Sequence, residues 1–271
     1  MALDGLSGLE RSRPWLAPWQ PWLAHVLPLL HAGHGVASAL NFAAAQLKLG
    51  ATGVRFVPQS ELPKGVAYEA FIAETACVPT RENLHDLFNG LCWLRFAALK
   101  RRLNALQASE LNRLGMGPTR GPVRDALTLL DENAVLIQGP ALSHRALRRR
   151  QWHDLFIAHR ALWSHTRLTV LGHALLEKLL QPYKSITAHV IWIDEESLSA
   201  STPEALQTPG TRGDHELEHM VLQRLTPSWL AGKPFLPLPV LGLPGWSADN
   251  TQPEFYRDTQ VFRPAPIPTV P

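Results

Sequence analysis

The sequence is short of charged residues. Asp, Glu, Lys and Arg make up only 18% of its 271 residues, while apolar residues make up 45%; an average soluble protein is roughly one-quarter charged. This composition excludes a largely disordered chain. The net charge is only +3, less than the excess typical of a generally basic nucleic-acid-binding protein. Nucleic acid is therefore not favoured as a partner.

Cysteine is also scarce, and long uninterrupted apolar runs are missing. The two cysteines, Cys77 and Cys92, lie in apolar surroundings and cannot form a disulfide framework. We interpret both as small buried side chains in a reducing compartment. Residues 22–45 are apolar but contain three histidines and a proline, which a membrane-spanning helix rarely accepts. Since prolines also interrupt any export signal, we expect a cytoplasmic protein without a membrane span.

Proline and tryptophan are abundant near the ends of the chain. Residues 14–22 (PWLAPWQPW) predict an extended or turn-rich arm, within residues 1–33, that docks through its tryptophans. Residues 231–271 predict a proline-rich tail whose aromatic side chains pack on the domain. The pattern predicts strands within 51–78 and at 185–194, and helices over 34–49, 82–107, 122–134, 151–181 and 214–225. We expect one α+β domain over residues 1–271, mainly helical, with long core helices, a small sheet and a wrapped tail.

The helix beginning near Asn83 combines a leucine-rich face with unusual polar chemistry. Projected at 100° per residue, its polar side carries a stripe of His85, Asp86, Asn89, Trp93, Lys100 and Asn104. A solvated face would carry mainly lysine and glutamate, whereas His, Asp and Asn are poor helix formers but good ligands and hydrogen-bonding groups. The stripe indicates either a functional site or a buried polar network that sets helix packing.

Two further polar groups could join this stripe. His173 and Glu177 are one helical turn apart, so they could transfer protons, bind a metal or simply orient each other. Asp131 and Glu132 end an apolar segment, where they could bind a cation or pair with Arg124. The candidate catalytic residues are His85, Asp86, Asn89, His173 and Glu177. The candidate ligands for a divalent metal ion are Asp131 and Glu132.

The sharpest motif is His215-Glu216-Leu217-Glu218-His219, which matches H-E-x-x-H. In zinc proteases, two histidines one turn apart bind zinc and the glutamate activates water. Here Glu218 places a charge where such helices are apolar, both histidines fall on the polar side, and no third ligand follows closely. We therefore rank zinc binding by His215 and His219, and a metalloprotease activity, below the stripe.

Two arginine-rich stretches, 100–102 and 145–150, could contact phosphates. Each is short and lies on or beside a predicted helix, so a solvated face is the more common outcome. An activity on nucleic acid remains a minor alternative.

Several phrases of the sequence together resemble the bacterial family called domain of unknown function 3025. They are NLHDLFNGLCWLRF, LTLLDENA, GHALLEK, and PLPVLGLPGW with FYRDTQVFRP, and the resemblance extends from about residue 67 to 263. The residues that match the family pattern are His85, Asp86, Asn89, Trp93, Asp131, Glu132, His173, Glu177, Trp246, Asn250, Phe255, Tyr256, Asp258 and Arg263. The resemblance implies that the tail belongs to the fold, and it implies no particular activity, cofactor or partner.

Two classes of function follow from these observations. The first is an enzyme, or a protein that binds a metal or small ligand, using the His/Asp/Asn/Glu cluster; a hydrolase is the least specific chemistry that fits. The second is a non-catalytic interaction module whose binding surface is the Trp-rich arm and the tail. The first class requires His85 and His173 to converge, which the sequence spacing does not establish.

Overall fold

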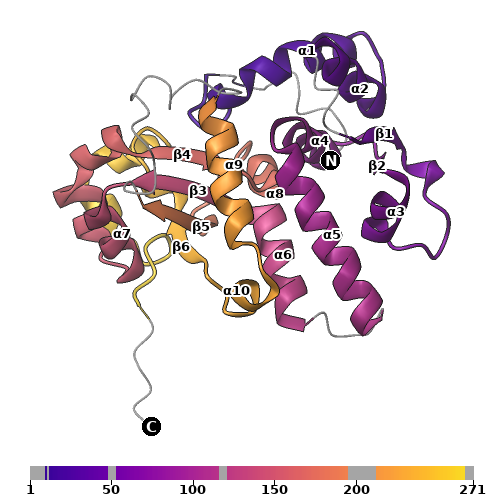
Figure 1. Cartoon of the computed structure of the whole chain (residues 1–271). Coiled ribbons are helices and arrows are strands. Elements are labelled where there is room, and N and C mark those ends of the chain that lie inside the picture. Colours follow the sequence, from indigo (N-terminus) through magenta and orange to yellow (C-terminus); the bar gives the residue numbers. More distant parts are fainter. Residues whose placement is uncertain (1–9, 11, 48–52, 116–120, 195–211, 266–271) are drawn as a thin grey trace.

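The computed structural model describes residues 10, 12–47, 53–115, 121–194 and 212–265. Its fold is α+β with helices predominating, as the sequence predicts. The α-helices are α1 (Gln20–His31), α2 (Val36–Gln46), α3 (Tyr68–Thr75), α4 (Leu84–Arg95), α5 (Ala97–Leu114), α6 (Gly121–Asn133), α7 (Ala141–Arg148), α8 (His173–Lys178), α9 (Arg212–Arg224) and α10 (Pro227–Ala231). Figure 1 shows the long helices α5 and α6 on one side of the molecule and the main sheet with α7 on the other.

The main sheet has the strand order β4-β3-β5-β6. Its strands are β3 (Ala134–Gly139), β4 (Arg167–Val170), β5 (Thr187–Asp194) and β6 (Leu236–Pro239). β3 is parallel to β5, with Ala134 opposite His189, whereas β4 and β6 are antiparallel to their neighbours. Every residue of β3 is buried, which is typical of a strand covered on both faces.

A second sheet consists of two parallel strands, β1 (Arg55–Pro58) and β2 (Cys77–Thr80). Helix α2 packs on β1 and also on α4. The contact between α2 and α4 requires Gly90, since a Cβ atom there would lie 2.2 Å from Cδ1 of Leu40. Helix α8 packs against both α4 and α6, so the polar side of α4 meets two other helices.

Most of the predicted elements are confirmed. The helices expected at 34–49, 122–134 and 214–225 correspond to α2, α6 and α9, and the strand expected at 185–194 is β5. The strands expected within 51–78 are β1 and the start of β2. The last residues of the first helix, 48 and 49, lie outside the described part of the chain.

The single helix predicted over 82–107 is wrong, because the chain breaks between α4 and α5. Phe96 has φ −123° and ψ 52° and ends α4, and its buried ring packs edge-on against Trp19. The break also lets the preceding Arg95 form a buried ion pair with Asp214 of α9. Tertiary packing therefore overrides a helical pattern that is continuous in the sequence.

The long helix predicted over 151–181 is also wrong. This segment forms a π turn (Asp154–Ala158), a 3-10 turn (Arg160–His165), strand β4 and the short helix α8. β4 pairs with the buried strand β3, so the tertiary context of this segment overrides its helical pattern. As a result His159 and His173 do not share a helix.

Two local predictions need smaller corrections. Residues 68–75, expected to be β-rich, form α3, which ends at Ala76 in the left-handed conformation with φ 55°. The arm at 14–22, expected to be extended or turn-rich, contains a 3-10 turn and the start of α1, so the turn-rich alternative is confirmed and the extended one is wrong. Its tryptophans Trp15, Trp19 and Trp22 are nevertheless buried in the core, as expected for a docked segment.

The tail packs its aromatic side chains on the π turn. The rings of Tyr256 and Phe262 each lie 5.7 Å from the ring of Phe156, and Asn250 is buried with its amide donating to the carbonyl oxygens of Leu241 and Leu243. Among the described residues, no helix is both long and apolar enough to cross a membrane.

Candidate functional site

The start of α4 is fixed by a hydrogen-bonded cap. The side chain of Asn83 accepts a hydrogen bond from the backbone N–H of Asp86 at 2.8 Å, a common arrangement at helix N-termini. The Asp86 carboxylate in turn accepts from the backbone N–H of Arg81 and from its guanidinium. Asp86, a candidate catalytic residue, thus anchors the start of α4. The neighbouring residue, His85, contacts Glu177 of α8.

Helix α8 is docked closely on the end of α6. A Cβ atom at Gly172 would lie 2.4 Å from the carbonyl oxygen of Glu132, so only glycine allows this approach. The Gly172 N–H donates to the carbonyl oxygen of Ala134 at 2.9 Å. This close approach brings the next residue, His173, within 2.8 Å of the carbonyl oxygen of Asp131 through its Nδ1 atom.

The two histidines predicted to belong to the site, His85 of α4 and His173 of α8, contact each other where these helices pack. Nε2 of His85 lies 3.1 Å from Nε2 of His173, and the rings are edge to face, with centroids 4.5 Å apart. Nδ1 of His85 lies 2.9 Å from Oε2 of Glu177. His173 and Glu177, one turn apart on α8, therefore both contact His85.

The direction of these hydrogen bonds determines where the protons lie. A carbonyl oxygen only accepts, so Nδ1 of His173 donates to Asp131; an ionised carboxylate also only accepts, so Nδ1 of His85 donates to Glu177. Two neutral rings would then face each other with a lone pair on each Nε2 atom. A hydrogen bond across the 3.1 Å contact would therefore need a further proton on one of the two Nε2 atoms.

The two rings differ in burial. Desolvation lowers the pKa of His173 to about 4, despite the opposing effect of the Asp131 carboxylate. His173 is thus neutral at pH 7 and accepts through Nε2. The side chain of His85 is 33% exposed, and its Nδ1 atom lies 2.9 Å from Oε2 of Glu177. Of the two rings, His85 is therefore the one that solvent can reach.

A buried lysine lies next to the histidine pair. The ammonium group of Lys100, only 4% exposed, pairs with the carboxylate of Asp131, donates to Oδ1 of Asn89 at 2.8 Å and lies 5.5 Å from the centre of the Trp93 ring. Burial alone would raise the pKa of Asp131, but the charge of Lys100, with a smaller effect of His173 in its protonated form, outweighs burial and lowers the pKa. Asp131 therefore stays ionised between Lys100 and His173.

A small cavity adjoins this part of the cluster. Its volume is about 60 Å³, enough for a small polar group or a few water molecules. Asn89 donates to the hydroxyl of Tyr68 at 3.1 Å, and burial, reinforced by Asp86 and Asp131, raises the pKa of that hydroxyl so that it stays protonated. The cavity is lined by Tyr68, Glu69, Ile72, Asn89, Trp93, Lys100, Leu103, Asn104, Gln107, Leu127 and Asp131.

The structure thus brings His85, Asn89, Asp131, His173 and Glu177 into one connected network. Sequence reasoning did not propose Tyr68 and Lys100 as site residues. Lys100 carried a signal, since a lysine stood among His, Asp and Asn on the polar side of the helix. Tyr68 carried none, because its segment was expected to be β-rich.

The other predicted metal ligands, Glu132, His215 and His219, are not part of this hydrogen-bonded network. The carbonyl oxygen of Glu132 faces Gly172. His215 and His219 are exposed on α9, where His219 contacts Gln223. In the described part of the chain, no three His, Cys, Asp or Glu side chains are grouped so as to hold a metal ion.

Comparison with known proteins gives one match. The model of a protein family matches residues 54–266 of the chain. This chain belongs to the family described as protein of unknown function, DUF3025. No curated protein and no solved structure matches it. All members of the network, from Tyr68 to Glu177, lie within the matched DUF3025 region, whereas α1 and α2 precede it.

Proposed function

We propose that the chain is an enzyme that acts on a small polar molecule and that its His85–His173 pair transfers a proton. The observation that carries this proposal is the direction of the hydrogen bonds. Both Nδ1 atoms donate away from the pair, so an added proton lies between two Nε2 atoms 3.1 Å apart. A positioned imidazolium that can give up a proton is a general acid, and after doing so it is a base.

The residues of the network have separate roles in this proposal. His85 is the catalytic residue because its side chain is partly exposed, whereas that of His173 is only 6% exposed. Glu177 stabilises the His85 imidazolium and orients its ring, and His173 holds the proton on the other side. Lys100 keeps Asp131 ionised and lines the neighbouring cavity. A hydrolase is the least specific reaction class that uses these groups.

A divalent metal ion is the second candidate occupant of the same place. It would replace the shared proton between the two Nε2 atoms. Carboxylate and carbonyl acceptors on the opposite ring nitrogens are the partners that orient metal-bound histidines. Two protein nitrogens are, however, fewer than the three protein ligands usual at catalytic zinc, so we place the proton first.

A non-catalytic interaction module remains the alternative class. Its support is that Asn89, Lys100 and Asp131 satisfy one another, as in a structural network. The buried tryptophans of the arm do not favour the arm as a binding surface. We also propose a cytoplasmic location, supported by two free thiols, and a bacterial source, which rests only on the family resemblance.

Nitrogen-15 NMR of the histidine rings tests the proposal directly. At pH 7, in protein treated with a chelator, we expect both nitrogens of His85 to be protonated and only Nδ1 of His173. A neutral His85 ring under these conditions would refute the shared proton. If the untreated protein instead lacks both Nε2 protons and regains one with chelator, the metal is the native occupant.

A substrate screen tests the catalytic role. The wild-type chain is assayed against ester, amide and phosphate-ester substrates, and any turnover is compared with that of His85→Gln and Glu177→Gln. Loss of a general acid–base group typically costs about 100-fold or more in rate, so we expect at least that loss for His85→Gln. The control is His219→Gln, an exposed histidine. Turnover that survives His85→Gln unchanged would place the chemistry elsewhere.

A further inference from the structure

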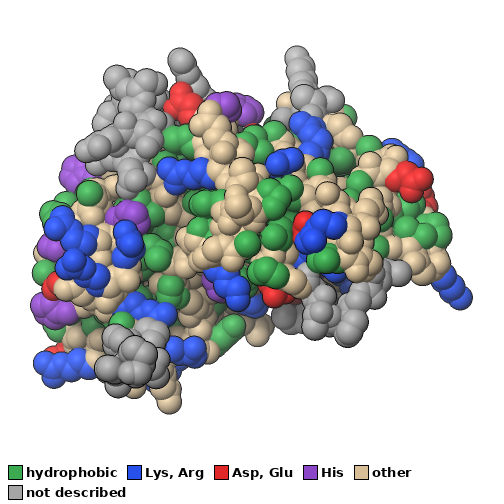
Figure 2. Space-filling view, turned by 60° about the horizontal axis from the view of Figure 1, so that its bottom comes forward, with side chains coloured by type: hydrophobic (Ala, Val, Ile, Leu, Met, Phe, Trp, Pro, Cys, Tyr) green, Lys and Arg blue, Asp and Glu red, His purple; other side chains and the backbone are tan. Residues whose placement is uncertain are grey.

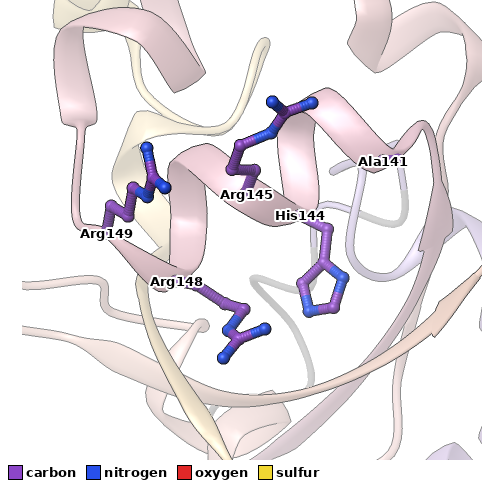
Figure 3. Close-up of a pocket in the computed structure, with 5 residues that line it drawn as sticks. All are labelled: Ala141, His144, Arg145, Arg148 and Arg149. Carbon is purple, nitrogen blue, oxygen red and sulfur yellow. The ribbon is translucent and has the colours of Figure 1, made fainter.

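A second polar feature lies at the other side of the molecule, on α7. This helix follows β3 directly, at the end where β3 and its parallel neighbour β5 both terminate (Figure 1). In open α/β sheets, ligands bind outside the carboxyl ends of the parallel strands, and β3 and β5 form one such parallel pair. A surface pocket of about 350 Å³ lies here, lined by Ala141, His144, Arg145, Arg148 and Arg149 (Figure 3).

The pocket carries a concentrated positive charge. No aspartate or glutamate occurs between residues 134 and 153, whereas arginines occupy 145, 148, 149 and 150. These four charges exceed the net charge of +3 of the whole chain. Figure 2 shows Lys, Arg and His side chains gathered on the side of the molecule where α7 lies.

Three of the arginines have no acidic partner in the described residues. The side chains of Arg145, Arg148 and Arg149 are exposed, and the structure shows no ion pair for them within residues 10–265 as far as these are described. Arg150 differs, since its Nη1 atom donates to the carbonyl oxygen of Pro264 at 3.0 Å. Arg150 thus links the tail to the end of α7, whereas Arg145, Arg148 and Arg149 are available to bind a ligand.

The spacing of the basic side chains produces two forks. His144 and Arg148 are one turn apart, as are Arg145 and Arg149, and Figure 3 shows each pair extending to its own side of the helix. The His144 ring stacks on Trp192 of β5, 5.0 Å away and within 4° of parallel. This stacking holds the His144 ring in one orientation at the edge of the pocket.

From this arrangement we propose that the α7 pocket binds a small anion bearing phosphate groups. Planar guanidinium groups match phosphate oxygens in geometry and charge. A pocket of this size is typical of a small ligand. The structural alternative is that the arginines at the C-terminal end of α7 only stabilise the helix dipole. That role requires neither the forks nor the stacked histidine.

Calorimetric titration with inorganic pyrophosphate tests the site. We expect saturable binding to the wild-type chain that weakens as salt increases. The double substitution Arg145→Gln with Arg148→Gln removes one member of each fork and should weaken binding at least about tenfold, since each lost charge-assisted hydrogen bond contributes that much. Circular dichroism establishes that the variant is folded.

The matched control is Arg257→Gln, an exposed arginine outside the pocket, which should bind pyrophosphate like the wild-type chain. Absence of saturable binding, or an equal loss in the control, would overturn the proposal. A 20-nucleotide RNA is titrated in parallel. If it binds more than about 100-fold more tightly than pyrophosphate and loses affinity in the double variant, the face is a nucleic-acid surface and the small-anion site is refuted.

Discussion

His215 and His219 lie four residues apart on α9, whereas His85 and His173 lie 88 residues apart in the chain on two different helices. The first pair matches a well-known zinc motif, yet both side chains are exposed. The second pair matches no motif, yet its Nε2 atoms are 3.1 Å apart. The difference arises from the neighbours, since Glu177 and Asp131 orient the second pair.

The two glutamates of the α9 motif, Glu216 and Glu218, also differ in their neighbours. In the α9 motif, the buried acid is Glu218 rather than the motif residue Glu216, and its Oε1 atom accepts from the backbone N–H of Leu99 at 2.8 Å. Glu218 thus holds the first turn of α5. The charge that seemed out of place for a zinc protease is explained by this contact between α9 and α5.

The largest expected difference between the His85–His173 pair and the His215–His219 pair is their effect on the free energy of unfolding at low pH. The folded-state pKa of His173 is about 4, against 6.5 in the unfolded chain, so the unfolded state binds more protons between these values. Stability contributed by neutral His173 is complete above pH 6.5 and falls as the pH drops towards 4, by about 3 kcal/mol. Urea unfolding as a function of pH measures this loss.

Two variants sharpen that experiment. His173→Asn keeps an amide donor near the Nδ1 position and removes the titrating group, so most of the loss between pH 6.5 and 4 should disappear. His219→Gln should keep the whole loss because His219 is exposed. An unchanged pH profile in His173→Asn would show that another group destabilises the protein in acid.

A smaller effect is expected from the acids of α9. Glu218→Ala leaves the Leu99 N–H buried without its acceptor and should cost about 2 kcal/mol of unfolding free energy, measured by urea denaturation. Glu216 is only half-buried, so Glu216→Ala on the same helix should cost less than Glu218→Ala. The reverse order would favour a role for the motif itself.

The smallest effect is expected for Glu177→Gln. This change keeps the shape of the side chain but removes the charge opposite His85, and a partly exposed ion pair contributes about 1 kcal/mol or less. The proposed shared proton predicts a larger loss at pH 6 than at pH 9. An equal loss at both values would mean that His85 carries no added proton.

Part of the fold follows from the sequence because the signals are local. Periodic apolar residues located α2, α6 and α9, and β-branched residues located β5. The break at Phe96 was not predictable in this way, because the segment is helical on both sides of it. Asn89 and Lys100 would be about 16 Å apart along a straight helix. The break brings the Lys100 ammonium group within 2.8 Å of Asn89.

The residue types of the candidate site were also predictable, but their partners were not. His85, His173 and Glu177 were chosen because such groups are unusual on apolar helices, and a local property of the sequence was sufficient for that choice. Their contact depends on Gly172, which allows α8 to approach the end of α6. The same local signals predicted one helix over 151–181, which the structure divides into a π turn, a 3-10 turn, β4 and α8.

The sequence by itself determined an α+β chain dominated by helices, the family to which it belongs and the chemical groups of the network, because composition, periodicity and motif matches are properties of neighbouring residues. Only the tertiary structure decided that two distant histidines contact each other while two histidines one turn apart on α9 face solvent. The physical reason is that burial and the partners of a side chain's hydrogen bonds are set by helices far apart in the chain.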